Sequence, residues 1–160
     1  MISNFSHKKG FTLTEMLVTM AILAVLAAVV LPLAKIAVQR EKEFSLRRNL
    51  RILRDTIDSY KKLTDEKKFE FEEETNGYPP DLDTLVQGVE VNIKEGDKEI
   101  IKIIKFLRRI PKDPMTNSYE WGLRSYQDKP DSVSWGGQNV YDVYTKNPGT
   151  ALDGSKYNEW

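Results

Sequence analysis

The apolar residues of this chain begin as one continuous run. From Met16 to Ala34 every position is apolar apart from Thr19. The 24 residues of 11–34 would form a helix of about 36 Å, and the hydrocarbon layer of a bilayer is about 30 Å thick. We therefore predict that 11–34 is a helix that spans a membrane, with Pro32 as a kink of the kind that such helices tolerate.

A periodic stripe follows this run and predicts that the same helix continues over 35–60. Its apolar positions alternate at spacings of four and three, with charged residues between them. They are Leu46, Leu50, Leu53, Ile57 and Tyr60. The stripe covers too few heptads for a coiled coil, so we expect it to pack on the chain's own globular part.

The rest of the chain, 61–160, shows short elements separated by turn residues and charged connections. Asp81 or Asp83 is expected to cap a short helix around 82–86. The segment Glu99–Arg109 has helical length and apolar residues on most of one side, which predicts a second helix.

Two later segments have the composition of strands, Tyr119–Tyr126 and Asn139–Thr145. The polar, glycine-containing loop 128–137 separates them. We predict that they pair as a small antiparallel sheet. The predicted fold class is therefore α+β, with one long N-terminal helix packed on a small antiparallel β-sheet domain.

Composition narrows the function classes. The chain has 24 basic and 24 acidic residues, so it carries no overall positive charge that would attract nucleic acid. It has no cysteine, which excludes disulfides and thiolate metal sites. Its one histidine is His7, so a chain cut after residue 10 would lack both the commonest general base and the commonest zinc ligand.

An enzyme is disfavoured for the same reasons. The sequence shows no nucleophile signature and no glycine-rich phosphate loop. The acid pairs Asp81/Asp83 and Asp128/Asp131 are better read as helix caps and turns than as acid–base machinery. The acidic run Glu72–Glu74 is read as a solvated face rather than a metal cluster.

The residues around the start of the apolar run indicate which way it crosses the membrane and which class of membrane segment it is. Lys8-Lys9 place the N-terminus in the cytoplasm by the positive-inside rule. A secretory signal peptide would have a shorter apolar core followed by a small-residue cleavage site, and neither is present. A plain single-pass anchor fits the run, but it gives no reason for a carboxylate at Glu15.

Glu15 also has a local explanation. Thr12-Leu13-Thr14-Glu15 matches a capping box, in which Thr12 caps the helix and Glu15 reaches back to its amide. The run from Lys8 to Glu15, KKGFTLTE, however, also resembles the type III signal of prepilins. This resemblance to the type IV pilin-like family implies cleavage between Gly10 and Phe11 by a prepilin peptidase, followed by methylation of the new amine.

The family resemblance also implies a role for Glu15 in assembly. Its carboxylate would pair with the terminal amine of a neighbouring subunit, and an unpaired carboxylate in a low-dielectric setting is costly. The implied domains are a leader peptide (1–10), a transmembrane and assembly segment (11–34), an amphipathic helix continuation (35–60) and a periplasmic globular domain (61–160).

The globular part resembles the major pseudopilin of type II secretion. The segments that carry this resemblance are NGYPPDLDTLV, FLRRIPKDPMTNSYEWGL, NVYDVYTKNPG and the final tryptophan. It implies a protein of the bacterial inner membrane that forms a periplasmic filament. The implied partners are further copies, minor pseudopilins, the prepilin peptidase, membrane lipid, and an inner-membrane secretion or pilus assembly platform. A type IV pilin that forms a surface filament remains the alternative.

The C-terminal loop departs from that family pattern, whose members bind calcium there. Asp153 is the candidate calcium ligand, because hard cations prefer carboxylate and carbonyl oxygens. Lys156 stands where a second acidic ligand is expected, and Asp153-Gly154 is also a common turn pair. Packing of aromatic residues is the competing way to hold the loop.

A membrane-anchored binding module is the remaining class. Trp121 and Trp135 are its candidate contact residues, because exposed aromatic side chains often dominate binding surfaces. The sequence is compatible with a buried Trp135 as well as with an exposed one.

Overall fold

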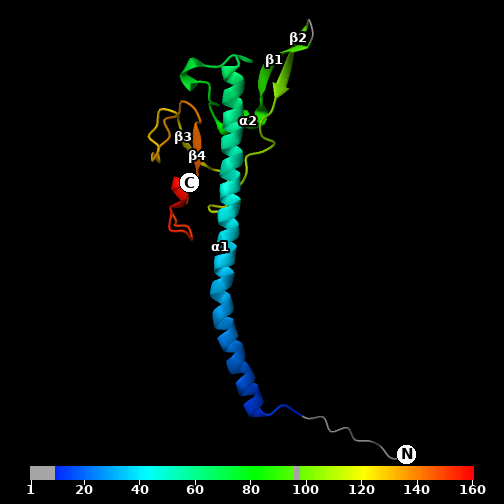
Figure 1. The fold of residues 1–160 in the computed structure, drawn as a ribbon, viewed down its shortest axis with the longest axis vertical. Coiled ribbons are helices and arrows are strands. Elements are labelled where there is room, and N and C mark those ends of the chain that lie inside the picture. The colour runs from blue at the N-terminus through cyan, green and yellow to red at the C-terminus, as the bar shows by residue number, and fades with distance from the viewer. Residues whose placement is uncertain (1–9, 96–97) are drawn as a thin grey trace, which may run out of the picture. The chain divides into compact units, whose positions relative to one another are not determined.

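The structure is a computed structural model that describes residues 10–95 and 98–160. The predicted leader, with His7 and Lys8-Lys9, lies outside the described residues apart from Gly10. The chain divides into two compact units, one reaching to Gln39 and the other covering Arg40–Trp160. The elements in chain order are α1 (Leu13–Asp65), the 3-10 turn η1 (Glu73–Thr75), α2 (Leu82–Gln87), β1 (Val89–Glu95), β2 (Lys98–Ile104), β3 (Gly122–Arg124), β4 (Asp142–Tyr144) and the 3-10 turn η2 (Tyr157–Glu159) (Figure 1).

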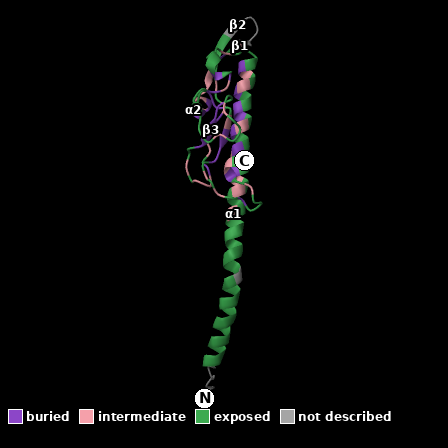
Figure 2. Cartoon of the chain, turned by 90° about the vertical axis from the view of Figure 1, so that its left-hand side faces the viewer, coloured by how far each residue is buried: buried purple, intermediate pink, exposed green. Residues whose placement is uncertain are grey.

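In the first unit, α1 is helical through the whole apolar run, including Pro32. The side chains described there are exposed on every side (Figure 2). The most apolar window of 18 residues has a mean hydropathy of 2.7 and no buried share. By length and composition this segment can cross a membrane, which fits a single-pass anchor.

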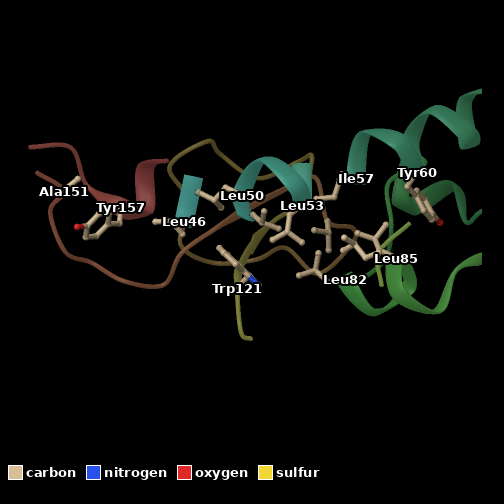
Figure 3. Close-up of a cluster of buried hydrophobic side chains, with 13 residues drawn as sticks. Leu46, Leu50, Leu53, Ile57, Tyr60, Leu82, Leu85, Trp121, Ala151 and Tyr157 are labelled. Atoms are coloured by element: carbon tan, nitrogen blue, oxygen red, sulfur yellow. The ribbon is translucent and has the colours of Figure 1, made fainter. Parts of the chain in front are cut away.

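In the second unit, α1 is amphipathic, and the predicted stripe forms the core of the domain (Figure 3). Leu46, Leu53 and Ile57 have no exposed surface. Full burial of such a side chain contributes about 1.5–3 kcal/mol. The prediction for the stripe is confirmed. Its partners from the rest of the domain include Leu82, Leu85, Leu107, Trp121, Val140, Val143, Ala151 and Tyr157.

The helix ends five residues later than residue 60, at Asp65. Thr64 is 2 % exposed and donates its hydroxyl to the carbonyl of Tyr60, so the buried face extends one more turn. Lys67 then adopts a left-handed backbone with φ 52° and donates its amide to the carbonyl of Thr64. This conformation is a common way to end a helix.

Helix α2 confirms the predicted cap at Asp81. The Asp81 carboxylate accepts hydrogen bonds from the amide of Thr84 at 2.7 Å and from its hydroxyl at 2.8 Å. The helix ends at Gly88, where φ is +88°. A Cβ at this position would lie 2.5 Å from the carbonyl oxygen of Ile104, so the turn into β1 requires glycine.

The predicted helix over Glu99–Arg109 is wrong. This region forms strand β2, which pairs antiparallel with β1 in the register Val89↔Ile104 to Glu95↔Lys98. Spacing along one short apolar segment does not separate a helix from a strand, whereas isoleucine-rich composition favours the strand. The segment then leaves the sheet, and the amides of Phe106 and Leu107 both donate to the carbonyl of Leu85.

The predicted antiparallel pair between the last two strands is confirmed, although both strands are shorter than expected. Strands β3 and β4 pair in the register Gly122↔Tyr144 to Arg124↔Asp142. Gly122 lies directly under the Tyr144 ring, so a Cβ there would approach the ring carbons to 2.3–2.6 Å. The fold is α+β and pilin-like, with a long N-terminal helix and two small antiparallel sheets, as the sequence predicts.

Candidate processing and assembly site

The predicted scissile bond, between Gly10 and Phe11, lies just before α1 in exposed chain. Gly10 is exposed and Phe11 is 77 % exposed. A Cβ built on Gly10 would meet no atom within 4 Å. The fold therefore makes no steric demand for glycine at this position, and any such demand must come from another molecule that handles this segment.

Helix α1 begins with half of the predicted capping box. The amide of Glu15 donates to the hydroxyl oxygen of Thr12 at 3.2 Å, as an N-cap requires. In the described part of the chain, the Glu15 carboxylate makes no hydrogen bond or ion pair of its own. The cap thus explains Thr12 but leaves the Glu15 carboxylate available to a partner.

The surface around this carboxylate is apolar. Leu13, Met16 and Leu17 are 77 %, 50 % and 59 % exposed. Exposed apolar surface of this extent is expected only where lipid or other protein covers it. A cationic partner would stabilise a single carboxylate in such a covered surface, since burial of an unpaired charge is costly.

Asp153, the candidate calcium ligand, lies in a tight turn of the C-terminal loop. Its Oδ1 accepts hydrogen bonds from the amide and hydroxyl of Ser155, and its Oδ2 accepts from the Arg47 guanidinium at 2.9 Å. These hydrogen bonds, those of Ser155 first, lower the pKa of Asp153. The described residues include no group of three or more acidic or histidine side chains that could hold a metal. The residues thus fit calcium poorly, and its binding at Asp153 stays a prediction.

The other acidic candidate with a clear role is Asp128, which closes a turn. Its carboxylate accepts from the amides of Ser125 and Gly136, at 2.7 Å and 3.0 Å. These backbone hydrogen bonds lower its pKa. Like Asp81, it shapes the backbone, in agreement with the cap-and-turn reading of these two residues.

The two candidate contact tryptophans differ. Trp121 is buried and donates its indole N–H to the carbonyl of Pro111 at 2.9 Å. Trp135 is 40 % exposed and donates to the carbonyl of Asn139 at 2.8 Å. Trp121 is therefore a core residue, and only Trp135 retains surface for contact.

A network of arginines, which no local sequence pattern predicts, holds the C-terminal residues. Arg54 binds the Asp142 carboxylate at 2.7 Å and the main-chain oxygen of Trp160 at 2.6 Å. Arg124 also reaches Asp142, at 3.2 Å, and its guanidinium carbon lies 4.1 Å from the centre of the Tyr144 ring. No local pattern reveals these contacts, because Arg54 and Asp142 are 88 positions apart.

Comparison with known proteins identifies a motif near the N-terminus of the chain. Residues 5–31 match the family model described as the prokaryotic N-terminal methylation motif. No curated protein and no solved structure matches the chain. The match covers the predicted scissile bond, Glu15 and most of the apolar run. The chain therefore carries the signal of a type IV pilin-like or pseudopilin precursor, which points to a structural subunit.

Proposed function

We propose that this chain is a pseudopilin of a type II secretion system. A prepilin peptidase cuts it between Gly10 and Phe11 and methylates the new amine of Phe11. The subunit waits in the inner membrane with its globular domain in the periplasm. An assembly platform then adds it to a periplasmic filament that supports protein export.

The observation that carries this proposal is the exposed apolar part of α1 with its one early carboxylate. Between Leu13 and Ala34 the described side chains have no cover from the rest of the chain, and Glu15 is the only charged residue among them. Packing of such helices against one another would bury this surface. Pairing of Glu15 with the Phe11 amine of a neighbour would offset the cost of placing the carboxylate there.

A type IV pilin that forms a surface filament is the second candidate. The methylation motif is compatible with both classes, so it does not distinguish a pilin from a pseudopilin. The resemblance of NGYPPDLDTLV and FLRRIPKDPMTNSYEWGL to the major pseudopilin favours the secretion role. Location of the filament, periplasmic or on the cell surface, separates the two candidates.

The test uses the full chain in a bacterial host that supplies a prepilin peptidase and an assembly platform. Gly10→Leu is expected to block cleavage, which a shift in gel mobility reports. Glu15→Ala is expected to be cleaved normally but to lower the yield of sheared filaments at least tenfold. Glu41→Ala is the matched control, because Glu41 is also an exposed carboxylate on α1 but lies beyond the apolar run.

Either of two results would contradict the mechanism. One is normal cleavage of Gly10→Leu, which would place the processing site elsewhere. The other is normal filament yield from Glu15→Ala, which would leave the Glu15 carboxylate without a role in assembly.

A further inference from the structure

Charge is segregated along the second unit although the whole chain is neutral. Residues 40–54 contain six basic and two acidic residues, a balance of +4. Residues 65–74 contain six acidic and two basic residues, a balance of −4. The positive stretch lies on α1 beside the first half of the core stripe, and the negative stretch begins where α1 ends.

The positive stretch includes an uncovered face of α1, which we call the outer face and define by Phe44, Arg48, Arg51 and Ile52. These positions lie on the side of the helix opposite the core stripe. Phe44 is 68 % exposed and Ile52 is 38 % exposed. Within the residues that the structure describes, Arg48 and Arg51 form no ion pair, whereas Arg47 and Arg54 bind acidic groups of the same domain.

A groove borders the outer face. It has a volume of about 430 Å³ and is lined by Arg47, Leu50, Arg51, Arg54, Asp55 and Trp160. Arg51 belongs to both the groove and the outer face. The combination offers a second molecule arginine donors for carboxylates next to apolar side chains.

The negative stretch has the complementary make-up. Phe71 is 42 % exposed and is followed by the exposed carboxylates of Glu72, Glu73 and Glu74. The segment is fixed to the domain by Thr75, which is buried and donates its hydroxyl to the carbonyl of Glu72 at 2.7 Å. An aromatic side chain among carboxylates thus matches a phenylalanine and an isoleucine among arginines.

We propose that Phe71–Glu74 of one copy docks on the outer face of a second copy. The contact rests on the proposed function and names the surface by which neighbouring globular domains recognise one another. Within one copy, the ion pairs of the described residues do not join Glu72–Glu74 to Arg48 or Arg51, so both groups are available to a second copy. Two different patches joined head to tail make a contact that extends into an open filament with one polarity when its rotation does not close into a ring.

The test exploits the absence of cysteine from the chain. Arg48→Cys and Glu73→Cys are made in separate full-length copies, which are expressed together with the peptidase and assembly platform and then oxidised. We expect a disulfide-linked dimer only when both copies are present. Asp83→Cys replaces Glu73→Cys in the control, because Asp83 is an exposed acidic residue outside the segment.

A charge exchange gives the second readout. Arg48→Glu with Arg51→Glu is expected to lower filament yield at least fivefold, and adding Glu73→Lys with Glu74→Lys to the same chain is expected to restore most of it. Arg108→Glu with Arg109→Glu, two exposed arginines outside the outer face, is the control.

The possible outcomes test the proposed contact and the proposed function separately. If wild-type filaments form but the mixed cysteine pair gives no dimer above the Asp83→Cys control, the contact is wrong and the filament stands. If the arginine replacements lower yield and the lysine replacements do not restore it, the outer face serves another acidic partner, such as anionic lipid, and the proposal is overturned. If the wild type forms no filament, the proposed function itself fails.

Discussion

The two parts of helix α1 differ in what covers their apolar side chains. Before Gln39 its described apolar side chains are exposed on every side, whereas beyond Arg40 the apolar stripe from Leu46 to Tyr60 lies on one buried face. The second part obtains its stabilisation from the chain's own domain. The first part has only lipid or other copies to cover it, so its sequence specifies an interaction between molecules, and the second specifies a fold.

The sharpest way to separate the two parts is to truncate one leucine in each. Leu53→Ala removes a side chain with no exposed surface and is expected to cost about 2–5 kcal/mol of unfolding free energy. Leu23→Ala, at a position 64 % exposed, is expected to leave the unfolding of the domain unchanged. Urea unfolding of the full chain in detergent, followed by tryptophan fluorescence, measures both. Equal losses would mean that the two parts of α1 do not differ in this way.

The arginines of the second part can be compared in the same assay. Arg124 is 6 % exposed and binds Asp142, Ser132 and Asn158. Arg124→Ala is expected to cost about 1.5–3 kcal/mol, because it leaves buried acceptors without their charged donor. Arg48→Ala, on the outer face, is expected to stay within about 0.5 kcal/mol of the wild type. A larger effect of Arg48→Ala would show that this side chain already has a partner within the monomer.

Glycines give a third comparison. Gly122→Ala places a methyl group against the Tyr144 ring and is expected to cost about 1–3 kcal/mol. Gly10→Ala meets no neighbour and is expected to leave stability unchanged. Thermal unfolding in detergent compares the two variants with the wild type. An unchanged melting temperature for Gly122→Ala would mean that the ring moves aside at little cost.

The smallest expected effect concerns the turn at Asp153. Hydrogen bonds from Ser155 and Arg47 lower the pKa of this carboxyl in the folded chain. Its contribution to stability is therefore present above the unfolded pKa of about 3.8 and is lost as pH falls through the lower folded value. Hydrogen exchange of the Ser155 amide between pH 2 and 6 should show this loss, and Asp153→Asn should remove the dependence. The same acid dependence in both proteins would assign it to another group.

The sequence alone was sufficient to predict the structural features that depend on a local pattern of residues. The stripe from Leu46 to Tyr60 repeats at helical spacing and has one buried face, and Asp81 stands directly before a short helix. Strand β2 was not predicted, because Ile100–Ile104 has too few residues for their spacing to exclude a helix. Its pairing with β1 is a contact between two segments of the chain, which local spacing does not reveal.

The candidate sites were predicted unevenly for the same physical reason. Gly10, Phe11 and Glu15 are neighbours in the chain, so a short motif contains the whole site. Asp153 instead takes its charge partner from Arg47, which is 106 positions away. Only the folded domain shows that this carboxylate already has donors for both oxygens.

Gly10 and Gly88 are both single glycines in the sequence, but of these two positions the described fold requires glycine only at Gly88. Replacement of Gly88 is penalised inside the molecule, since a Cβ would press against the Ile104 carbonyl, and Gly10 has empty space around it. A survey that scores variants by how well they fold would rank position 10 among the most tolerant in the chain. The proposed cleavage after Gly10 predicts that a screen in cells that contain a prepilin peptidase would instead rank position 10 among the intolerant ones.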